Sequence, residues 1–183
     1  MPRGWPATIS ITSAPRACVS QPPHNPAPDR ILGAMSWKPS ITVAAVIETD
    51  GRFLVVEEVI RGRRVFNQPA GRVEANEDLL SAVVRETLEE TAWHFEPQWL
   101  LGIYPWRSQV TQRTTVRFAF TGRVHTHEPT RALDSPVIAT HWLRRAELLL
   151  PARVLRTPVV MRCIDDYLSG RRLPLTSIND PPD

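Results

Sequence analysis

One stretch of 23 residues, from Gly71 to Trp93, constrains the fold more than any other part of the chain. It reads GRVEANEDLLSAVVRETLEETAW. Its second part predicts a helix from Glu77 to about Thr91, because apolar residues recur there at helical spacing and Asn76 precedes it as a cap. The predicted packing side consists of Leu80, Val83, Val84 and Thr87. The chain must therefore adopt a fold that covers one side of this helix.

Five residues of this stretch are glutamates, and three of them share one turn of the predicted helix. Glu86, Glu89 and Glu90 are spaced i, i+3 and i+4, so their carboxylates emerge close together. One interpretation is a solvated surface helix, since like-charged neighbours cost only about 0.2–0.5 kcal/mol per pair and Arg85 can pair with Glu89. The other is that the carboxylates converge on a hard divalent cation such as Mg²⁺, which takes oxygen ligands. The spacing alone leaves both interpretations open.

The residues in front of the helix favour the second interpretation. Pro69 and Gly71, within NQPAGRVEAN, form a rigid loop whose backbone carbonyls can turn toward the helix. The whole pattern consists of Gly71, Glu77, Arg85-Glu86 and Glu89-Glu90. It resembles the Nudix box, a long and specific motif. The resemblance extends over essentially all of residues 35–175, which look like the phosphatase NudJ branch of bacterial Nudix hydrolases.

This resemblance implies an α+β domain with a mixed β-sheet between helices, the α/β/α sandwich of the Nudix fold. It also implies a small cytoplasmic hydrolase that depends on Mg²⁺, with Mn²⁺ as an alternative. The branch is similar to enzymes that release orthophosphate from nucleoside tri- and diphosphates and act on the thiamine pyrimidine pyrophosphate. The expected partner is therefore a small nucleotide or pyrimidine diphosphate, bound by a monomer or a small homo-oligomer.

The family pattern implies a metal site on the predicted helix. Glu86, Glu89 and Glu90 are expected to bind the metal, and one of them to orient or deprotonate the attacking water. Ala70, just before the box glycine Gly71, is expected to contribute its backbone carbonyl.

The pattern also implies a supporting pair next to the metal site. Glu77 and Arg85 are expected to hold the loop and the helix together. Arg85 is also expected to be one of the catalytic residues. Glu77 lies about 180° around the predicted helix from Glu86, which keeps it away from the substrate.

Three further residues are candidates for binding substrate. Arg117 is a candidate for contacting phosphate, and Phe66 and Trp106 are candidates for stacking on a base or pyrimidine ring. Packing or surface charge is the alternative role for each of them. Asp134 is a candidate for the later acid that many Nudix enzymes use as a base or extra ligand.

The stretch departs from the family pattern at three positions. Ala92 replaces a helix-ending glycine, and Thr87 and Trp93 replace aliphatic residues. Alanine in the left-handed conformation that often ends helices costs on the order of 1 kcal/mol, so these departures put the end of the helix in question and not the carboxylates.

The rest of the chain predicts strands before and after this helix. They are expected at residues 40–48, 52–59, 63–68, 100–107, 114–122 and near 140–143. Asp50-Gly51 supplies the first hairpin turn. A short helix is expected at 145–150, and a last helix begins at a Thr157 cap with Pro158 in its first turn and ends at Gly170. Its apolar stripe includes Cys163 as a core residue, and helices are expected on both faces of the sheet.

The chain divides into an expected domain and two flanking segments. Residues 1–34 contain seven of the 18 prolines and are expected to be a disordered extension, or to precede the true start at Met35. Residues 35–175 form the expected Nudix hydrolase domain, and residues 176–183 a C-terminal tail.

Composition excludes several other classes of protein. Residues 35–183 carry 19 basic and 18 acidic residues, so the net charge of +3 arises mostly from residues 1–34 and does not predict a nucleic-acid partner. No apolar run is long enough to span a membrane. Two distant cysteines predict neither a disulfide nor a zinc site and fit a reducing cytosol.

Two kinds of alternative function remain open at the level of sequence. One is a Nudix pyrophosphohydrolase with another substrate, such as a modified nucleotide, ADP-ribose or an RNA 5′ end. The other is a Nudix-fold protein that binds nucleotides without hydrolysing them.

Overall fold

The computed structural model describes residues 38–178. The expectations for residues 1–34, and for the last five residues of the C-terminal tail, lie outside the described residues. Within the described part, no helix is long and apolar enough to cross a membrane.

A mixed sheet of seven strands forms the centre of the described structure. Its main path is β3-β2-β1-β6-β5, with β4 paired to β1 and β7 paired to β2. The strands are β1 (Ser40–Thr49), β2 (Arg52–Ile60), β3 (Arg63–Asn67), β4 (Ala70–Arg72), β5 (Trp93–Arg107), β6 (Thr114–His127) and β7 (Val137–Leu143). Strands β1 and β6 run parallel, and the other pairs are antiparallel. The expected mixed sheet is therefore confirmed.

Two tight hairpins arise from local sequence. Asp50 and Gly51 both have positive φ, 51° and 75°, as the predicted turn between β1 and β2 requires. Arg61 and Gly62 have the same geometry, with φ of 50° and 75°, and join β2 to β3. Both turns match the right-handed twist of the strands they connect, so the register of β1, β2 and β3 is fixed locally.

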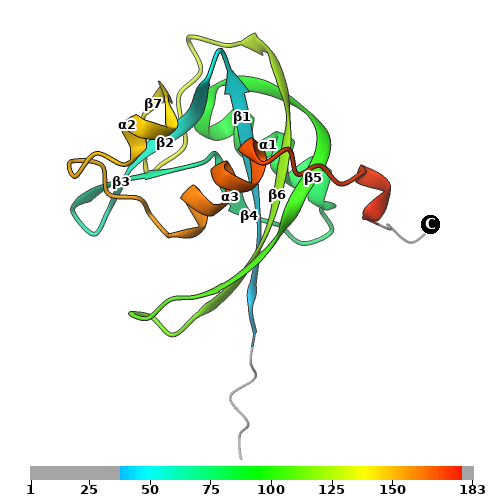
Figure 1. Ribbon diagram of the computed structural model, residues 1–183, viewed down its shortest axis with the longest axis horizontal. Coiled ribbons are helices and arrows are strands. Elements are labelled where there is room, and N and C mark those ends of the chain that lie inside the picture. The colour runs from blue at the N-terminus through cyan, green and yellow to red at the C-terminus, as the bar shows by residue number, and fades with distance from the viewer. Residues whose placement is uncertain (1–37, 179–183) are drawn as a thin grey trace, which may run out of the picture. The chain divides into compact units, whose positions relative to one another are not determined.

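Helices cover both faces of the sheet, as expected (Figure 1). The helices are α1 (Leu79–Thr91), α2 (Arg145–Leu148), α3 (Val159–Leu168) and the 3₁₀ helix η1 (Leu175–Ser177). On one face, Ala82 and Val83 of α1 pack with core residues of β1 and β2. On the other face, Cys163 and Ile164 of α3 and Leu148 of α2 pack against the sheet, which confirms that Cys163 is a core residue.

Helix α1 begins two residues later than predicted. Its cap is Asp78, whose carboxylate accepts from the amides of Leu80 and Ser81, both at 2.8 Å. Asn76 is not the cap, because it has a positive φ of 64° and turns the preceding loop. Glu77 therefore precedes the helix, and the expected angle of 180° between Glu77 and Glu86 around the helix axis does not apply.

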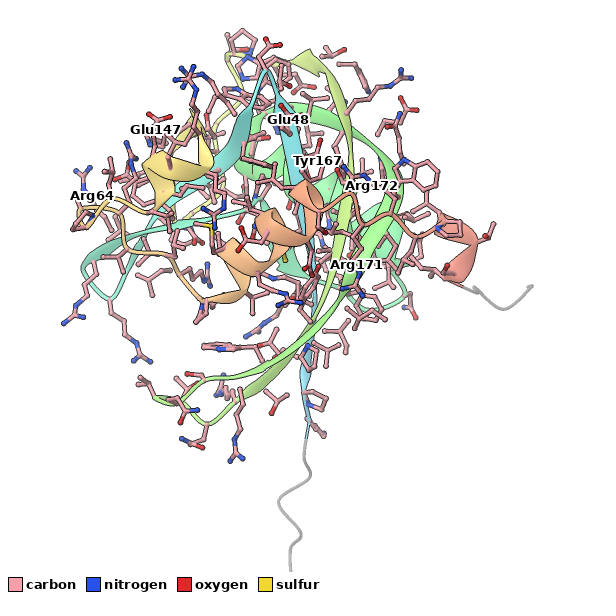
Figure 2. The ribbon with its side chains drawn as sticks, in the orientation of Figure 1. Glu48, Arg64, Glu147, Tyr167, Arg171 and Arg172 are labelled. Carbon is pink, nitrogen blue, oxygen red and sulfur yellow. The ribbon has the colours of Figure 1, made fainter. Side chains whose placement is uncertain are left out.

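Helix α3 also begins differently from the prediction. Its cap is Pro158, and the Thr157 hydroxyl is buried without a hydrogen-bond partner in the described structure. The end of α3 is held by Tyr167, whose hydroxyl donates to Glu48 at 3.1 Å and whose ring lies 4.1 Å from the Arg172 guanidinium (Figure 2). These contacts fix α3 against the sheet.

Candidate active site

The short strand β4 brings the loop of the box to its helix. The Ala70 amide donates to the Glu90 carboxylate at 2.7 Å, and Glu90 is only 7% exposed. Burial raises the pKa of Glu90 to about 8, although the Ala70 amide acts in the opposite direction. The Ala70–Glu90 bond therefore joins the end of α1 to β4.

Gly71 of β4 makes room for a second carboxylate. The Glu86 carboxylate occupies the space that a β-carbon on Gly71 would fill. Burial raises the pKa of Glu86, and the neighbouring Arg85 partly offsets that effect. A glycine is thus required here by close approach and not by an unusual φ.

Arg85 ties the loop in front of α1 to the helix. Its guanidinium donates to Glu77 at 2.7 and 2.8 Å and to the Arg72 carbonyl at 3.1 Å. It also donates from Nη1 to Glu86 and Glu89, both at 3.0 Å. The bond to Glu77 is the main reason that the pKa of Arg85 is raised. Arg85 therefore draws the Glu86 and Glu89 carboxylates to one point and offsets their repulsion.

A fourth glutamate, which sequence analysis did not identify, lies close to this group. Glu58 of β2 is completely buried and forms an ion pair with Arg156, yet its Oε2 atom has no hydrogen-bond partner. Burial raises the pKa of Glu58, and its charge contributes to the raised pKa of Glu90. Nothing in the sequence singled out Glu58, because VVEEV (residues 55–59) has the pattern of an ordinary β-strand.

These residues fit a divalent cation. The donors are hard carboxylate oxygens, which suit Mg²⁺ or Mn²⁺. Glu58 Oε2 is a buried acceptor without a partner, and the carboxyls of Glu86 and Glu90 carry raised pKa values that a nearby cation would lower. Within residues 38–178 no three acidic, histidine or cysteine side chains already surround one point, so the assignment of Glu86, Glu89 and Glu90 as ligands remains a prediction.

A cavity of about 1040 Å³ opens beside β4. Ala70 and Gly71 line it, and these two residues also contact Glu90 and Glu86. Its other walls come from the β2–β3 hairpin, the β5–β6 hairpin and the segment that leads into α3. In Figure 1 the turns of both hairpins point toward the left of the view, as does the segment that enters α3.

Arg117 of β6 lies in the wall of this cavity and is 8% exposed. Its guanidinium donates to Gln68 Oε1 at 3.1 Å and to Asn67 Oδ1 at 3.4 Å. Gln68 is oriented by its own bond to the Val160 carbonyl at 2.8 Å. Burial lowers the pKa of Arg117. Because neutral amides hold it, its positive charge stays available to an anion.

The other candidate residues lie in different surroundings. Trp106 lines the cavity with Arg117, as a substrate contact requires. Phe66 does not, because its ring is 6% exposed and belongs to the core beneath α3. Successive residues of a strand face opposite sides of the sheet, so Val65 and Asn67 line the cavity while Phe66 packs beneath α3. Asp134 has an exposed side chain, while its amide donates to the Glu89 carbonyl at 3.0 Å.

A mixed sheet between helices holds carboxylates beside a cavity that contains a buried arginine, a combination suited to binding a divalent cation together with a phosphate. Residues 37–163 match the model of the NUDIX domain. The chain therefore belongs to the Nudix family of hydrolases, which confirms the resemblance seen in the sequence.

Curated relatives place it beside one branch of this family. The chain is 40% identical to the phosphatase NudJ of Escherichia coli K12 over 144 residues. This match covers 79% of this chain and 93% of the relative. The phosphatase NudJ of Shigella flexneri shows the same identity and coverage.

Solved structures agree with the fold. A NUDIX hydrolase from Nitrosomonas europaea is 43% identical, with a TM-score of 0.76, and the match covers 79% of this chain and 98% of that one. The NUDIX domain of Shewanella oneidensis NrtR, complexed with ADP ribose, is 19% identical with a TM-score of 0.57 over 72% of this chain and 89% of that one. The second comparison supports the fold alone.

Proposed function

We propose that this protein is a Mg²⁺-dependent phosphohydrolase that releases orthophosphate from nucleoside tri- and diphosphates and from the thiamine pyrimidine pyrophosphate. Its substrates are small cytosolic nucleotides or pyrimidine diphosphates, and Mn²⁺ can replace Mg²⁺. The similarity to the phosphatase NudJ supports this choice within the family.

One observation of the structure carries the proposal. Strand β4 contacts the Glu86 and Glu90 carboxylates, and the same two residues, Ala70 and Gly71, line the cavity. The carboxylates do not line the cavity themselves, but a phosphate anhydride bound there is separated from them only by β4, within reach of a cation that they would hold.

The proposed roles divide between two groups of residues. Glu86, Glu89 and Glu90, with the Ala70 carbonyl, hold the cation. When bound, Mg²⁺ supplies positive charge that neutralises the phosphate oxygens.

The remaining residues position these groups and the substrate. Arg85 orients Glu86 and Glu89, and the Ala70 amide orients Glu90. Arg117 binds a phosphate oxygen, and Trp106 offers its ring to the base or pyrimidine. One of Glu86, Glu89 and Glu90 also orients the attacking water or accepts its proton.

The metal assignment predicts the effect of two substitutions. Glu89→Gln and Glu90→Gln each remove a negative charge without changing side-chain shape, so hydrolysis of GTP and GDP with Mg²⁺ is expected to fall by about 100-fold or more. Both variants are expected to keep the circular dichroism spectrum of the parent. Glu74→Gln is the matched control, because Glu74 is an exposed loop residue of the same motif. Parental rates in both site variants would show that the metal site is assigned wrongly.

A substrate panel tests the reaction itself. GTP, GDP, ADP-ribose and the thiamine pyrimidine pyrophosphate are incubated with Mg²⁺ or with EDTA, and orthophosphate and pyrophosphate are measured separately. Orthophosphate from the first two and the last, only with metal, is the expected result. Release of pyrophosphate from GTP would indicate another Nudix reaction, and tight binding without turnover would indicate a non-catalytic protein.

A further inference from the structure

The cavity beside β4 has an unusual charge composition. Six arginines line it, and no aspartate or glutamate does. They are Arg61, Arg63, Arg72, Arg113, Arg117 and Arg156. The whole chain has 22 basic and 19 acidic residues, so this separation of charge is a local property of the cavity and not of the composition.

Most of these arginines also lack acidic partners. Within residues 38–178 only Arg156, paired with Glu58, forms an ion pair, and the other five form none. Eight arginines outside the cavity do form ion pairs, Arg64 with Glu57 and Arg123 with Glu96 among them. The positive charge in the cavity is therefore only partly compensated, by Glu58 beside Arg156 and by the charges of Glu58 and Glu90 near Arg117, and a concave site focuses the field of the remainder.

The arginines extend well beyond the carboxylates. Arg63 lies at the turn end of β3 and Asn67 at the end next to β4. Four residues of strand separate them by about 13 Å. Arg61 lies in the same turn, and Arg113 leads into β6 from the other hairpin. Because these side chains lie away from β4, they are placed to contact phosphates beyond the two that flank the cleaved bond.

We propose that this cavity selects substrates by the number of phosphates. It binds a linear chain of three or more: the terminal anhydride, whose cleavage releases orthophosphate, lies at β4, and the phosphates that precede it in the chain are contacted by Arg61, Arg63 and Arg113. Guanidinium groups suit this role because they donate two parallel hydrogen bonds to a phosphate. The inference rests on the proposed function and refines it, since triphosphates are then preferred over diphosphates.

Binding of inorganic phosphates tests the proposal without hydrolysis. Calorimetry of the whole protein in EDTA compares orthophosphate, pyrophosphate and tripolyphosphate. Tripolyphosphate is expected to bind at least about ten-fold more tightly than pyrophosphate, which corresponds to about 1.4 kcal/mol. The difference is expected to shrink at high salt, because four of the five unpaired arginines, all except Arg117, are exposed. Equal affinities for the two compounds would overturn the proposal.

Single arginine-to-glutamine variants, each of which removes one positive charge, show which arginines contact the phosphates. Arg63→Gln and Arg113→Gln are each expected to weaken tripolyphosphate binding by roughly 3- to 10-fold. Arg107→Gln is the control, because Arg107 lies on the same hairpin as Arg113, is exposed and does not line the cavity. An equal loss in Arg107→Gln would show that net charge alone acts, and would overturn the proposal.

Two further measurements separate this inference from the reaction. If tripolyphosphate shows the expected order of affinity but no substrate is hydrolysed, the proposed function fails and the selection by phosphate number stands. If GTP and GDP are hydrolysed with equal kcat/KM in the parent, the selection fails and the proposed function stands. A short RNA with a 5′-monophosphate that binds as tightly as tripolyphosphate would also overturn the selection, since the cavity would then bind a nucleic-acid backbone.

Discussion

At the scale of single residues, Gly71 shows how closely the loop and the helix of the site meet. The Glu86 carboxylate fills the position of the absent side chain. The φ of Gly71 is not in the left-handed region, so alanine is compatible with the backbone. An added methyl group would therefore displace the carboxylate and leave the strand in place.

This contact predicts the effect of Gly71→Ala. The variant is expected to fold, because the displaced atoms are the end of a flexible side chain, but to lose about 10- to 100-fold in Mn²⁺ affinity and activity. Mn²⁺ binding is measured by electron paramagnetic resonance and folding by thermal denaturation. Adding Gly71→Ala to Glu86→Gln is expected to have little further effect. Full additivity of the two losses would contradict a mechanism through Glu86.

Sequence reasoning reached the box residues but not Glu58. The spacing of Glu86, Glu89 and Glu90 is local, and a helix brings them together whatever the tertiary fold. Glu58 forms its ion pair with Arg156, which is 98 residues away in the chain. Arg156 reaches Glu58 because the segment after α2 runs beside β3. Its neighbour Glu57 faces elsewhere and bonds to His141. No local pattern distinguishes the two glutamates.

At the scale of elements, the structure shows how α1 ends with Ala92 in place of the glycine of the family pattern. Ala92 adopts the left-handed conformation, with φ of 59°, and its amide donates to Leu88 at 2.9 Å. The helix therefore ends where the family pattern places the end. Ala92 is 3% exposed, and burial of its methyl group contributes about 0.8 kcal/mol, which offsets most of the backbone strain.

Two alanine-to-glycine variants separate these effects. Ala92→Gly relieves the strain and loses the methyl, so its free energy of unfolding is expected to stay within about 0.5 kcal/mol of the parent. Ala82→Gly, inside α1 and completely buried, loses a methyl and helix propensity together, about 2 kcal/mol. Urea denaturation measures both. A loss in Ala92→Gly as large as that in Ala82→Gly would show that the left-handed residue is not strained.

Strands β1, β2 and β3 were predicted within one residue at each end, whereas β4 was not predicted and β5, β6 and β7 are longer than predicted. Strand β5 begins at Trp93 and not near Leu100, although it contains Pro97 and Pro105. It is the last strand on the main path of the sheet, where a missing amide is tolerated. Gly122 was expected to end β6, yet the strand continues to His127. A β-carbon at Gly122 would collide with the Glu96 carbonyl, so this glycine permits close approach of β5 and is not a turn.

At the scale of the whole molecule, the position of the NUDIX domain predicts the shortest chain that is active. The NUDIX match starts at residue 37 and β1 at Ser40, so the sheet, the site and the cavity lie downstream of Met35. A chain that starts at Met35 is expected to have the melting temperature of the full chain within about 2 °C and the same kcat/KM. Thermal denaturation and the substrate panel check this. Insolubility or loss of activity would assign residues 1–34 a necessary role.

Overall charge gave little information about the site, because it sums over regions that behave differently. The near balance of acids and bases in residues 35–183 conceals an acidic cluster on α1 beside a cavity lined by arginines. A prediction of that separation needs the sheet order, which places two hairpins and the entrance to α3 around one space.

The division of the cavity walls has a consequence for how such proteins diversify. The proposed catalytic group is built on β4 and α1, whereas Arg61, Arg63 and Arg113 belong to hairpins that end in solvent. Substitutions or insertions at the hairpin ends leave the core on both faces of the sheet intact. Substrate range can therefore change during evolution by a few surface substitutions, while the chemistry of bond cleavage is inherited unchanged.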